Sequence, residues 1–206
     1  MTKQFHLPLP LRESMEAEDF FPAASNEDAV RWLLQTNCAD WPSHALILWG
    51  PEGAGKTHLL SMWVRAVQAS IIEPGEDIID DIVDGKGAAA YALDDAHLIA
   101  GDAEKEEWLQ HLYNATKANN TPLLLAAKNP PLSWGLKLPD ITTRLKSCEA
   151  VELKEPDDAL IHGLLLKLFQ DRQLLVGEGV VAYMAPRLER TGTAIRSAVE
   201  RLDEAA

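Results

Sequence analysis

The 206-residue sequence predicts an α/β protein, in which a parallel sheet flanked by helices is followed by a small all-helical lid. Apolar runs typical of buried strands alternate with stretches of helical spacing over most of the chain. A loop of the pattern G-x-x-x-x-G-K-T follows the first apolar run, and from Pro156 onward only helical patterns remain. The expected organisation is a tail, an α/β unit that carries this loop, and a lid, over residues 1–19, 20–155 and 156–206.

The composition limits the classes of function. The net charge is −13, whereas a protein that coats DNA normally carries the opposite sign because phosphate contacts dominate its affinity. We therefore expect little direct DNA binding. The chain starts without the apolar stretch of a signal peptide and has no run long enough to span a membrane, which predicts a cytoplasmic protein without membrane contact. Cys38 and Cys148 lack metal-ligand spacing and are expected to be buried and reduced.

The first region, residues 1–19, contains an apolar segment with two prolines. This segment runs from Gln4 to Pro10 with almost no charge, and an acidic run follows it. Pro8 and Pro10 disfavour a helix and favour an extended conformation. Such a segment can dock spaced side chains into pockets on a partner. A tail that lies against its own domain or stays disordered explains the residues equally well, so both alternatives stay open at this point.

The α/β unit begins with a predicted helix, for which Ser25 or Asn26 is the expected N-cap. A turn-rich connector then leads to the apolar run Ala45–Trp49. Five consecutive apolar residues bounded by turn residues predict the first buried strand of the sheet.

The glycine-rich loop after this strand, residues 50–57, has the pattern of a phosphate-binding loop. Its glycines allow successive backbone N–H groups to turn inward as an anion-binding nest, and the predicted helix Lys56–Val67 directs its positive end at the same point. Lys56 can reach the outer phosphates of a nucleotide, and the Thr57 hydroxyl can ligate Mg²⁺. The residues expected to contact the nucleotide here are Pro51, Glu52, Gly53, Ala54, Gly55, Lys56, Thr57 and His58.

Two aspartates end the apolar run Ala88–Leu93, which predicts a buried parallel strand. The carboxyl ends of such strands face the nucleotide in phosphate-loop proteins, so Asp94 is assigned to the metal, directly or through water. Asp95 is the candidate for polarising the attacking water; capping of the strand end is the plainer role for both acids. Before this run, Ser70–Ile72 predicts a short strand. The acidic residues 73–87 predict a surface helix, with metal binding as the less favoured alternative.

The remaining elements alternate until the lid begins. Asp102 is the expected N-cap of the next helix, and Thr121–Ala127 predicts a strand that leads into a proline-rich loop. A short helix over 140–146 holds Arg144, and Ala150–Leu153 is the last predicted strand. Three helical patterns then make up the lid, around residues 160–168, 180–184 and 195–202.

This order of features resembles the AAA+ ATPases, and more narrowly the nucleotide-binding module of the replication initiator DnaA. The likeness covers roughly residues 20–206. It implies an AAA+ P-loop fold that holds ATP or ADP with Mg²⁺. Two features differ from the initiator, because no DNA-binding helix-turn-helix follows residue 206 and the tail takes the place of its N-terminal domain. The stretches that carry the likeness, besides the lid, are Gly55–Leu60, Leu93–Gly101, Asn129–Pro131 and Leu138–Leu145.

The tail resembles the sliding-clamp-binding peptide of the Hda-like regulators, a DnaA-related family that inactivates the initiator. Phe5 stands where this peptide usually has leucine. The resemblance implies that Gln4 anchors the peptide on the clamp while Leu7 and Leu9 fill an apolar pocket. It also implies a function. Proteins of this kind, loaded on the DNA-bound clamp, promote hydrolysis of the ATP held by DnaA, so that initiation is not repeated.

The same resemblance assigns roles to further residues. Arg144 falls where the family has its arginine finger, a guanidinium that enters a neighbour's site and neutralises charge on the transferred phosphoryl group. Arg196 matches the second sensor arginine, which touches the phosphates of the bound nucleotide. Phe21, Pro22 and Asn26 match the segment that packs around the base. From position alone, a surface salt bridge is the plainer role for Arg144, and a solvated helix residue for Arg196.

One departure from the family concerns the end of the strand at Ala127. The family usually has a polar sensing residue there, whereas this chain continues with Lys128 and Asn129, either of which can substitute. We therefore expect weak intrinsic ATPase activity, with the nucleotide acting as a structural ligand. The alternative function is an active AAA+ ATPase of the helicase-loader or initiator type. The oligomeric state stays open, with a homo-oligomer among the alternatives.

Overall fold

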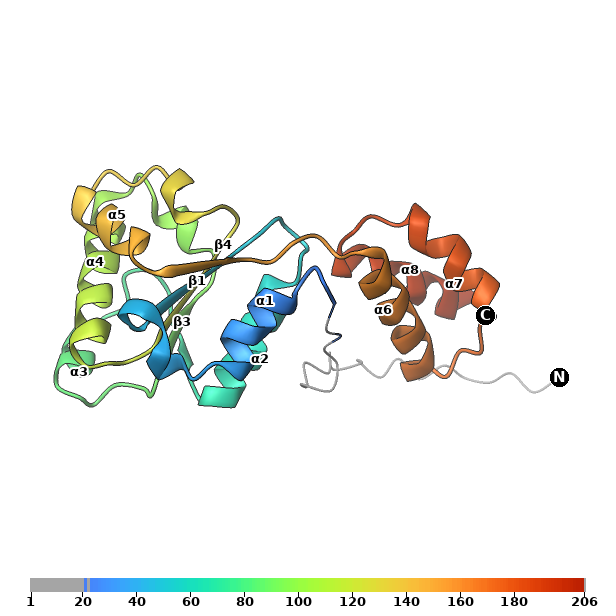
Figure 1. Ribbon diagram of the computed structural model, residues 1–206, viewed down its shortest axis with the longest axis horizontal. Coiled ribbons are helices and arrows are strands. Elements are labelled where there is room, and N and C mark those ends of the chain that lie inside the picture. The colour runs from blue at the N-terminus through green and yellow to red at the C-terminus, as the bar shows by residue number, and fades with distance from the viewer. Residues whose placement is uncertain (1–20, 22, 206) are drawn as a thin grey trace.

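In the computed structural model, which describes residue 21 and residues 23–205, the apolar runs form one five-stranded parallel sheet (Figure 1). The strands pair in the order β2–β3–β4–β1–β5, so the strand before the phosphate loop lies between β4 and β5. The predicted fold class is confirmed. The bounds are β1 (Ala45–Trp49), β2 (Ser70–Ile71), β3 (Tyr91–Leu93), β4 (Leu123–Ala127) and β5 (Glu149–Glu152).

Helices cover both faces of this sheet, which explains why its central strands are apolar at successive positions. Alternate residues of a strand point to opposite faces. Leu46 and Leu48 of β1 pack with α1, the π-helical turn after it and α2, whereas Ala45 and Ile47 pack with α3, α4 and α5. The bounds of these helices are α1 (Glu27–Val30), the turn Arg31–Gln35, α2 (Lys56–Val67), α3 (Ile79–Val83), α4 (Ala103–Ala118) and α5 (Pro139–Lys146).

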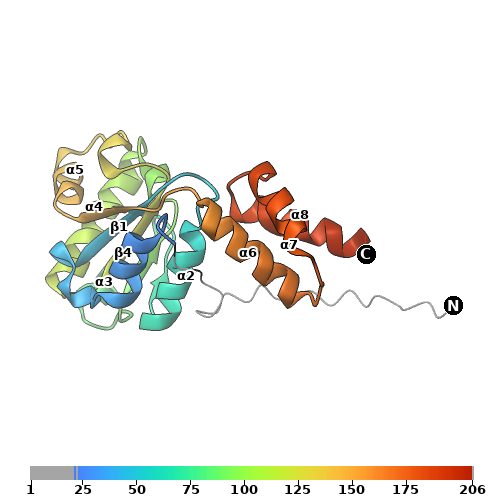
Figure 2. The ribbon, with the colours of Figure 1, turned by 45° about the vertical axis from the view of Figure 1, so that its right-hand side comes forward.

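Three helices after the last strand pack around a core of their own and are called the lid here. They are α6 (Asp158–Asp171), α7 (Glu178–Met184) and α8 (Gly192–Ala205). Figures 1 and 2 show them beside the α/β unit, joined to it by the segment that follows β5. Throughout the described chain, no helix combines the length and the apolar character needed to cross a membrane. The buried side chains of the lid core are Ile161, Leu165, Phe169, Val181, Ile195 and Val199.

The acidic stretch 73–87 differs from the prediction, because its helix covers only Ile79–Val83. Gly75 and Gly85 have φ angles of 94° and 70°, a left-handed conformation that ends a helix on either side. The metal-binding alternative finds no support either. Within residues 21 and 23–205, no three His, Cys, Asp or Glu side chains lie close enough together to hold a metal ion.

A strap at the start of the described chain, Phe21 and residues 23–26, joins the α/β unit to the lid. Ser25 accepts a hydrogen bond from the Lys154 N–H (3.2 Å) after β5 and donates its own N–H to the Asp157 carboxylate (3.1 Å), the N-cap of α6. The ring of Phe21 packs on Gly163 of α6, where a Cβ atom would lie 3.0 Å from the ring. The strap therefore contacts both sides of the connection between the two units.

Candidate functional site

The loop between β1 and α2 has the backbone conformation that its glycines predict. Gly53 and Gly55 have φ angles of 78° and 101°, which only glycine adopts without strain. Gly55 is the N-cap of α2, and no side chain caps this 12-residue helix. The first N–H groups of α2 therefore need partners from outside the helix, and together with the helix dipole they form a site suited to an anion.

Lys56 brings a positive charge into this loop. Its side chain is almost buried, since the residue is 9% exposed, and its ammonium donates hydrogen bonds to the carbonyls of Gly50 (2.9 Å) and Pro51 (2.8 Å). Burial lowers the pKa of the Lys56 ammonium, and nearby Asp94 and Asp95 offset part of this effect. A desolvated ammonium gains most from an anionic partner, so the loop fits a phosphate group.

Thr57 in the first turn of α2 and Asp94 directly after β3, the two residues expected to bind the metal, contact each other. The Thr57 hydroxyl donates a hydrogen bond of 2.8 Å to one Asp94 carboxylate oxygen, and the other oxygen accepts the Asp95 N–H at 2.9 Å. Hydroxyl and carboxylate oxygens are the ligands that Mg²⁺ prefers, and Mg²⁺ usually completes its shell with phosphate oxygens and water. This pair of residues fits a magnesium ion that is bound together with a polyphosphate.

A cavity of about 680 Å³ lies over the phosphate loop, within the range typical of small-ligand sites. Four separate segments of the chain line it. Two residues predicted for the site, Asp95 and Arg196, are among the lining residues. The structure therefore brings together residues that lie up to about 150 positions apart in the chain. From the loop and α2 these are Glu52, Gly53, Gly55, Lys56, Thr57 and His58; from the sheet edge Asp95, His97, Leu98 and Lys128; and from α8 Gly192, Thr193, Arg196, Ser197 and Glu200.

The lid closes one side of this cavity through direct contact with the loop. The Gly192 N–H donates to the Gly53 carbonyl at 3.2 Å, and Thr191 caps α8 by accepting the Ala194 N–H at 3.2 Å. A Cβ atom on Gly53 would lie 2.5 Å from the Thr191 side chain. Because only glycine permits this approach, the start of α8, and with it Arg196, lies close to the phosphate loop.

We therefore predict that Gly53→Ala separates α8 from the phosphate loop. Nucleotide affinity, measured by calorimetry, should fall about tenfold, equal to about 1.4 kcal/mol. Part of the loss comes from the positive φ at Gly53 and part from the clash with Thr191. In a Thr191→Gly background, Gly53→Ala should cost only the backbone part. Equal losses in both backgrounds would show that the two residues are not coupled.

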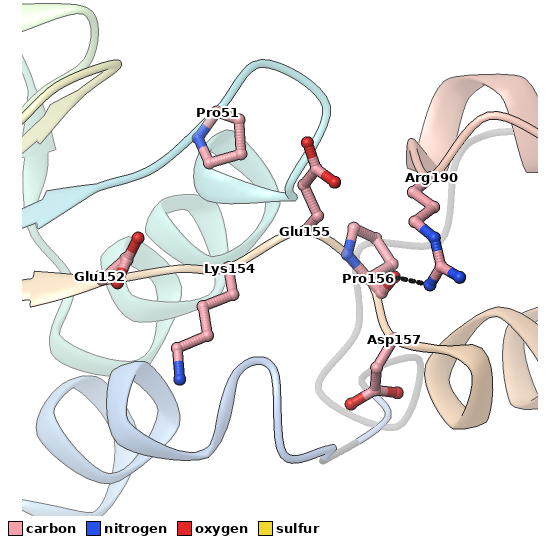
Figure 3. A pocket seen from close by; sticks show the side chains of 7 residues that line it. All are labelled: Pro51, Glu152, Lys154, Glu155, Pro156, Asp157 and Arg190. Atoms are coloured by element: carbon pink, nitrogen blue, oxygen red, sulfur yellow. Dashed lines mark hydrogen bonds between the residues drawn. The ribbon is translucent and has the colours of Figure 1, made fainter.

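Two predicted loop residues lie outside this cavity. Ala54 is buried in the core between the sheet and α2. Pro51 lines a second cavity of about 510 Å³ beside the connection between the α/β unit and the lid (Figure 3). There the Arg190 guanidinium donates to the Pro156 carbonyl at 3.0 Å. The other residues that line this second cavity are Glu152, Lys154, Glu155 and Asp157.

The expected base-contacting and clamp-contacting residues are placed only in part. Asn26 is the N-cap residue of α1, but its side chain does not cap the helix. Its amide oxygen accepts the Ala23 N–H and its amide nitrogen donates to the Phe21 carbonyl, both at 2.9 Å, so it holds the strap instead. The other predicted residues of these two groups, Pro22, Gln4, Leu7 and Leu9, lie outside the described residues.

Arg144 lies on α5, which Figure 1 shows at the end of the α/β unit away from the lid. Its guanidinium donates to one Asp140 oxygen (3.2 and 3.0 Å) and lies 5.9 Å from the centre of the Tyr113 ring. The side chain is 33% exposed and does not line the cavity over the phosphate loop. The salt bridge expected from position alone is therefore present, at a place remote from the chain's own loop.

Sequence reasoning left open or missed several residues that line the cavity. Of the two residues after β4, Lys128 lines the cavity, with its ammonium 3.7 Å from Glu52, whereas the Asn129 carbonyl accepts the Trp134 indole N–H at 2.8 Å. Glu200 lies one helical turn after Arg196, and this spacing is a signal that could have found it. The other residues missed are His97, Leu98, Gly192, Thr193 and Ser197.

Comparison with known proteins identifies the fold. Domain III of the replication initiation protein DnaA from Thermotoga maritima superimposes with a TM-score of 0.75 over 93% of this chain and 88% of that one, at 19% identity. DnaA from Aquifex aeolicus bound to AMPPCP gives a TM-score of 0.76 over 93% of this chain, which spans only 66% of that structure, at 16% identity. The fold is that of the AAA+ ATPases.

Sequence comparison also finds a relative that is similar along the whole chain. An uncharacterised protein of Haemophilus influenzae is 27% identical over 218 residues, an alignment that covers all of this chain and 92% of the relative. No protein-family model matches the chain. The AAA+ fold accounts for the position of the phosphate loop at the carboxyl edge of the sheet, beside the lid.

Proposed function

We propose that this AAA+ chain is a DnaA-related regulator of replication initiation. It holds ATP or ADP with Mg²⁺, docks on the sliding clamp and promotes hydrolysis of the ATP bound to DnaA in the cytoplasm. The observation that carries the proposal is that the basic residues expected to act on nucleotides lie in two separate places. Lys56 and Arg196 belong to the cavity over the phosphate loop, whereas Arg144 lies on α5, outside it. A guanidinium remote from its own nucleotide is available to a second protein's nucleotide.

The residues of the cavity are suited to holding a nucleotide. The loop N–H groups and Lys56 bind the phosphates, Arg196 approaches them from α8, and Thr57 with Asp94 holds Mg²⁺. When bound, Mg²⁺ neutralises phosphate charge. Lys128 directly follows β4, and an ammonium donates hydrogen bonds without accepting any. It cannot orient a water molecule by accepting its proton, which supports weak turnover by the chain itself.

Arg144 is held in a way that permits it to change partners. An exposed ion pair such as that with Asp140 contributes only about 0–1 kcal/mol, so a phosphoryl group can replace the carboxylate at small cost. The Tyr113 ring below the guanidinium supports it from within the α/β unit. Arg144 can therefore leave Asp140 without disrupting the core.

A reconstituted assay tests this function. It combines sliding clamp loaded on primed DNA, DnaA loaded with radiolabelled ATP, and this chain, and it measures the fraction of ADP on DnaA over time. We expect hydrolysis to accelerate only when clamp and chain are both present. ATP that stays intact on DnaA in the complete mixture would overturn the proposal.

Binding to the clamp depends on the apolar segment of the tail. We predict that the triple substitution Gln4→Ala, Leu7→Ala and Leu9→Ala weakens clamp binding by about 100-fold, since loss of a few anchoring side chains removes most of the affinity of a short docking peptide. The measurement is a titration of the full chain with clamp. Glu13→Gln, outside the motif, is the matched control. Should the wild-type chain not bind the clamp, this part of the proposal is wrong.

The second candidate is an active ATPase of the helicase-loader or initiator type. It is favoured by the completeness of the cavity, where Asp95 lies beside the Thr57–Asp94 pair. Rapid ATP hydrolysis by the isolated chain on single-stranded DNA, together with no effect on DnaA-bound ATP, would establish this candidate in place of the regulator.

A further inference from the structure

A buried carboxylate in the first turn of α4 has no role in the proposed cavity. Glu106 is 0% exposed, although its neighbours Glu104 and Glu107 are exposed. Among the Asp, Glu, Lys and Arg residues of the described chain, only Glu106 and Lys56 are buried. A buried charge costs free energy unless its partners satisfy it, so its contacts call for an explanation.

Three backbone N–H groups satisfy this carboxylate. One oxygen accepts the N–H of Gly101 at 2.8 Å, and the other accepts those of Lys137 (2.8 Å) and Leu138 (2.9 Å). The Lys137 ammonium also donates to the Gly101 carbonyl at 3.3 Å. Burial alone would raise the pKa of the Glu106 carboxyl, but the three donors outweigh it and lower the pKa. Glu106 is therefore ionised at neutral pH and joins two loops that lie 36 positions apart.

These two loops lead to the two functional regions of the chain. Gly101 ends the segment after β3, whose residues Asp95, His97 and Leu98 line the cavity. Leu138 is the N-cap of α5, the helix that carries Arg144, and no side chain caps that helix. Glu106 thus connects the start of α5 to the end of the segment that follows β3.

The carboxylate contributes to stability, because an apolar side chain in its place would leave the N–H groups of Gly101, Lys137 and Leu138 without this acceptor. A carboxylate also determines the orientation of the N–H groups that it accepts. Its two oxygens fix where three N–H groups point, and so fix the orientation of the backbone that enters α5.

We propose that Glu106 is a positioning residue for Arg144: by holding the N–H groups of Gly101, Lys137 and Leu138, it sets the orientation in which α5 presents the guanidinium to a second protein's nucleotide. This inference rests on the proposed function of Arg144. It adds a residue outside α5 and outside the cavity to those on which the position of Arg144 depends.

The test compares Glu106→Gln with Glu104→Gln, an exposed glutamate two residues earlier on the same helix. Hydrogen exchange of the full chain reports on the three amides, and the reconstituted assay reports on hydrolysis of DnaA-bound ATP. In Glu106→Gln we expect exchange of the Gly101, Lys137 and Leu138 amides to rise about tenfold or more. Stimulated hydrolysis should fall about tenfold or more, with the chain's own ATP and clamp affinities unchanged within about twofold. Glu104→Gln should match wild type in every measurement.

The two measurements separate failure of this inference from failure of the proposed function. Wild-type chain that leaves DnaA-bound ATP intact overturns the proposed function. If the three amides of Glu106→Gln exchange at the wild-type rate, the positioning role is wrong. It is also wrong if these amides exchange faster while hydrolysis of DnaA-bound ATP is fully stimulated. Glu106→Asp, which keeps the charge but shortens the side chain by one methylene, replaces the glutamine variant if that variant fails to fold, with the same results expected.

Discussion

Arg144→Ala is expected to abolish stimulated hydrolysis of DnaA-bound ATP, with a loss of about 10³-fold in rate, at the lower end of the effects known for arginine fingers. The physical reason is the loss of a guanidinium that neutralises charge developing on the transferred phosphoryl group. The other properties of the chain should change little. Arg144 lies outside the cavity, and its ion pair with Asp140 is exposed, so nucleotide affinity, clamp affinity and thermal stability should stay near wild type.

Two further variants sharpen this result. Lys146→Ala removes a second basic residue from the last turn of α5 and should retain stimulation, which controls for a general loss of positive charge. Arg144→Lys keeps the charge but loses the planar fork that contacts two oxygens at once, so most of the stimulation should be lost. Full stimulation by Arg144→Ala, measured as ADP on DnaA in the reconstituted assay, would remove Arg144 from the mechanism.

Lys56→Ala is expected to weaken nucleotide binding by at least about 100-fold, because a charge-assisted contact to phosphate in a desolvated loop contributes about 3 kcal/mol. Calorimetry with ADP and with ATP measures the loss directly. Thermal unfolding provides a second measurement. A ligand at 100 times its Kd stabilises the wild-type chain by about 2.7 kcal/mol, and this nucleotide-dependent shift should disappear in the variant.

Lys128→Ala is the matched control for this change. Lys128 also lines the cavity, but its side chain is 54% exposed and pairs with Glu52. Its replacement should weaken nucleotide binding only a few-fold, since an exposed charge is screened by water. Wild-type affinity in Lys56→Ala would contradict the assignment of residues 50–57 as the phosphate-binding loop.

The strands and the phosphate loop could be predicted from the sequence because their signals are local. Ala45–Trp49 is apolar at every position, and the predicted strand has the observed bounds. The prediction for Ala88–Leu93 began three residues early, since the Ala88 N–H donates to the Tyr91 hydroxyl and the ladder starts only at Tyr91. The helix predicted over 73–87 was too long. Gly75 and Gly85 adopt left-handed backbone angles that a helix cannot contain, although the isoleucines between them have helical spacing.

The rest of the site depends on contacts that no local pattern reveals. The first turns of α4 contain three glutamates, and nothing in their spacing indicates that Glu106 is the buried one. Similarly, Ser197 and Glu200 reach the cavity only because Gly192 bonds to Gly53 and places α8 beside the loop. The pairing of Gly192 with Gly53 joins residues more than 100 positions apart, and tertiary packing alone decides it.

The strap has a consequence for how the chain meets its partners. Only ten residues separate Pro10 from Phe21, a tether that spans at most about 40 Å in any conformation. Because the strap is bonded to both the α/β unit and α6, the clamp docking proposed for residues 4–10 would keep both units within that radius. In the proposed clamp complex this tether sets the effective concentration of the two units against the clamp surface in the millimolar range. Weak further contacts between either unit and the clamp are then sufficient to orient the chain on it.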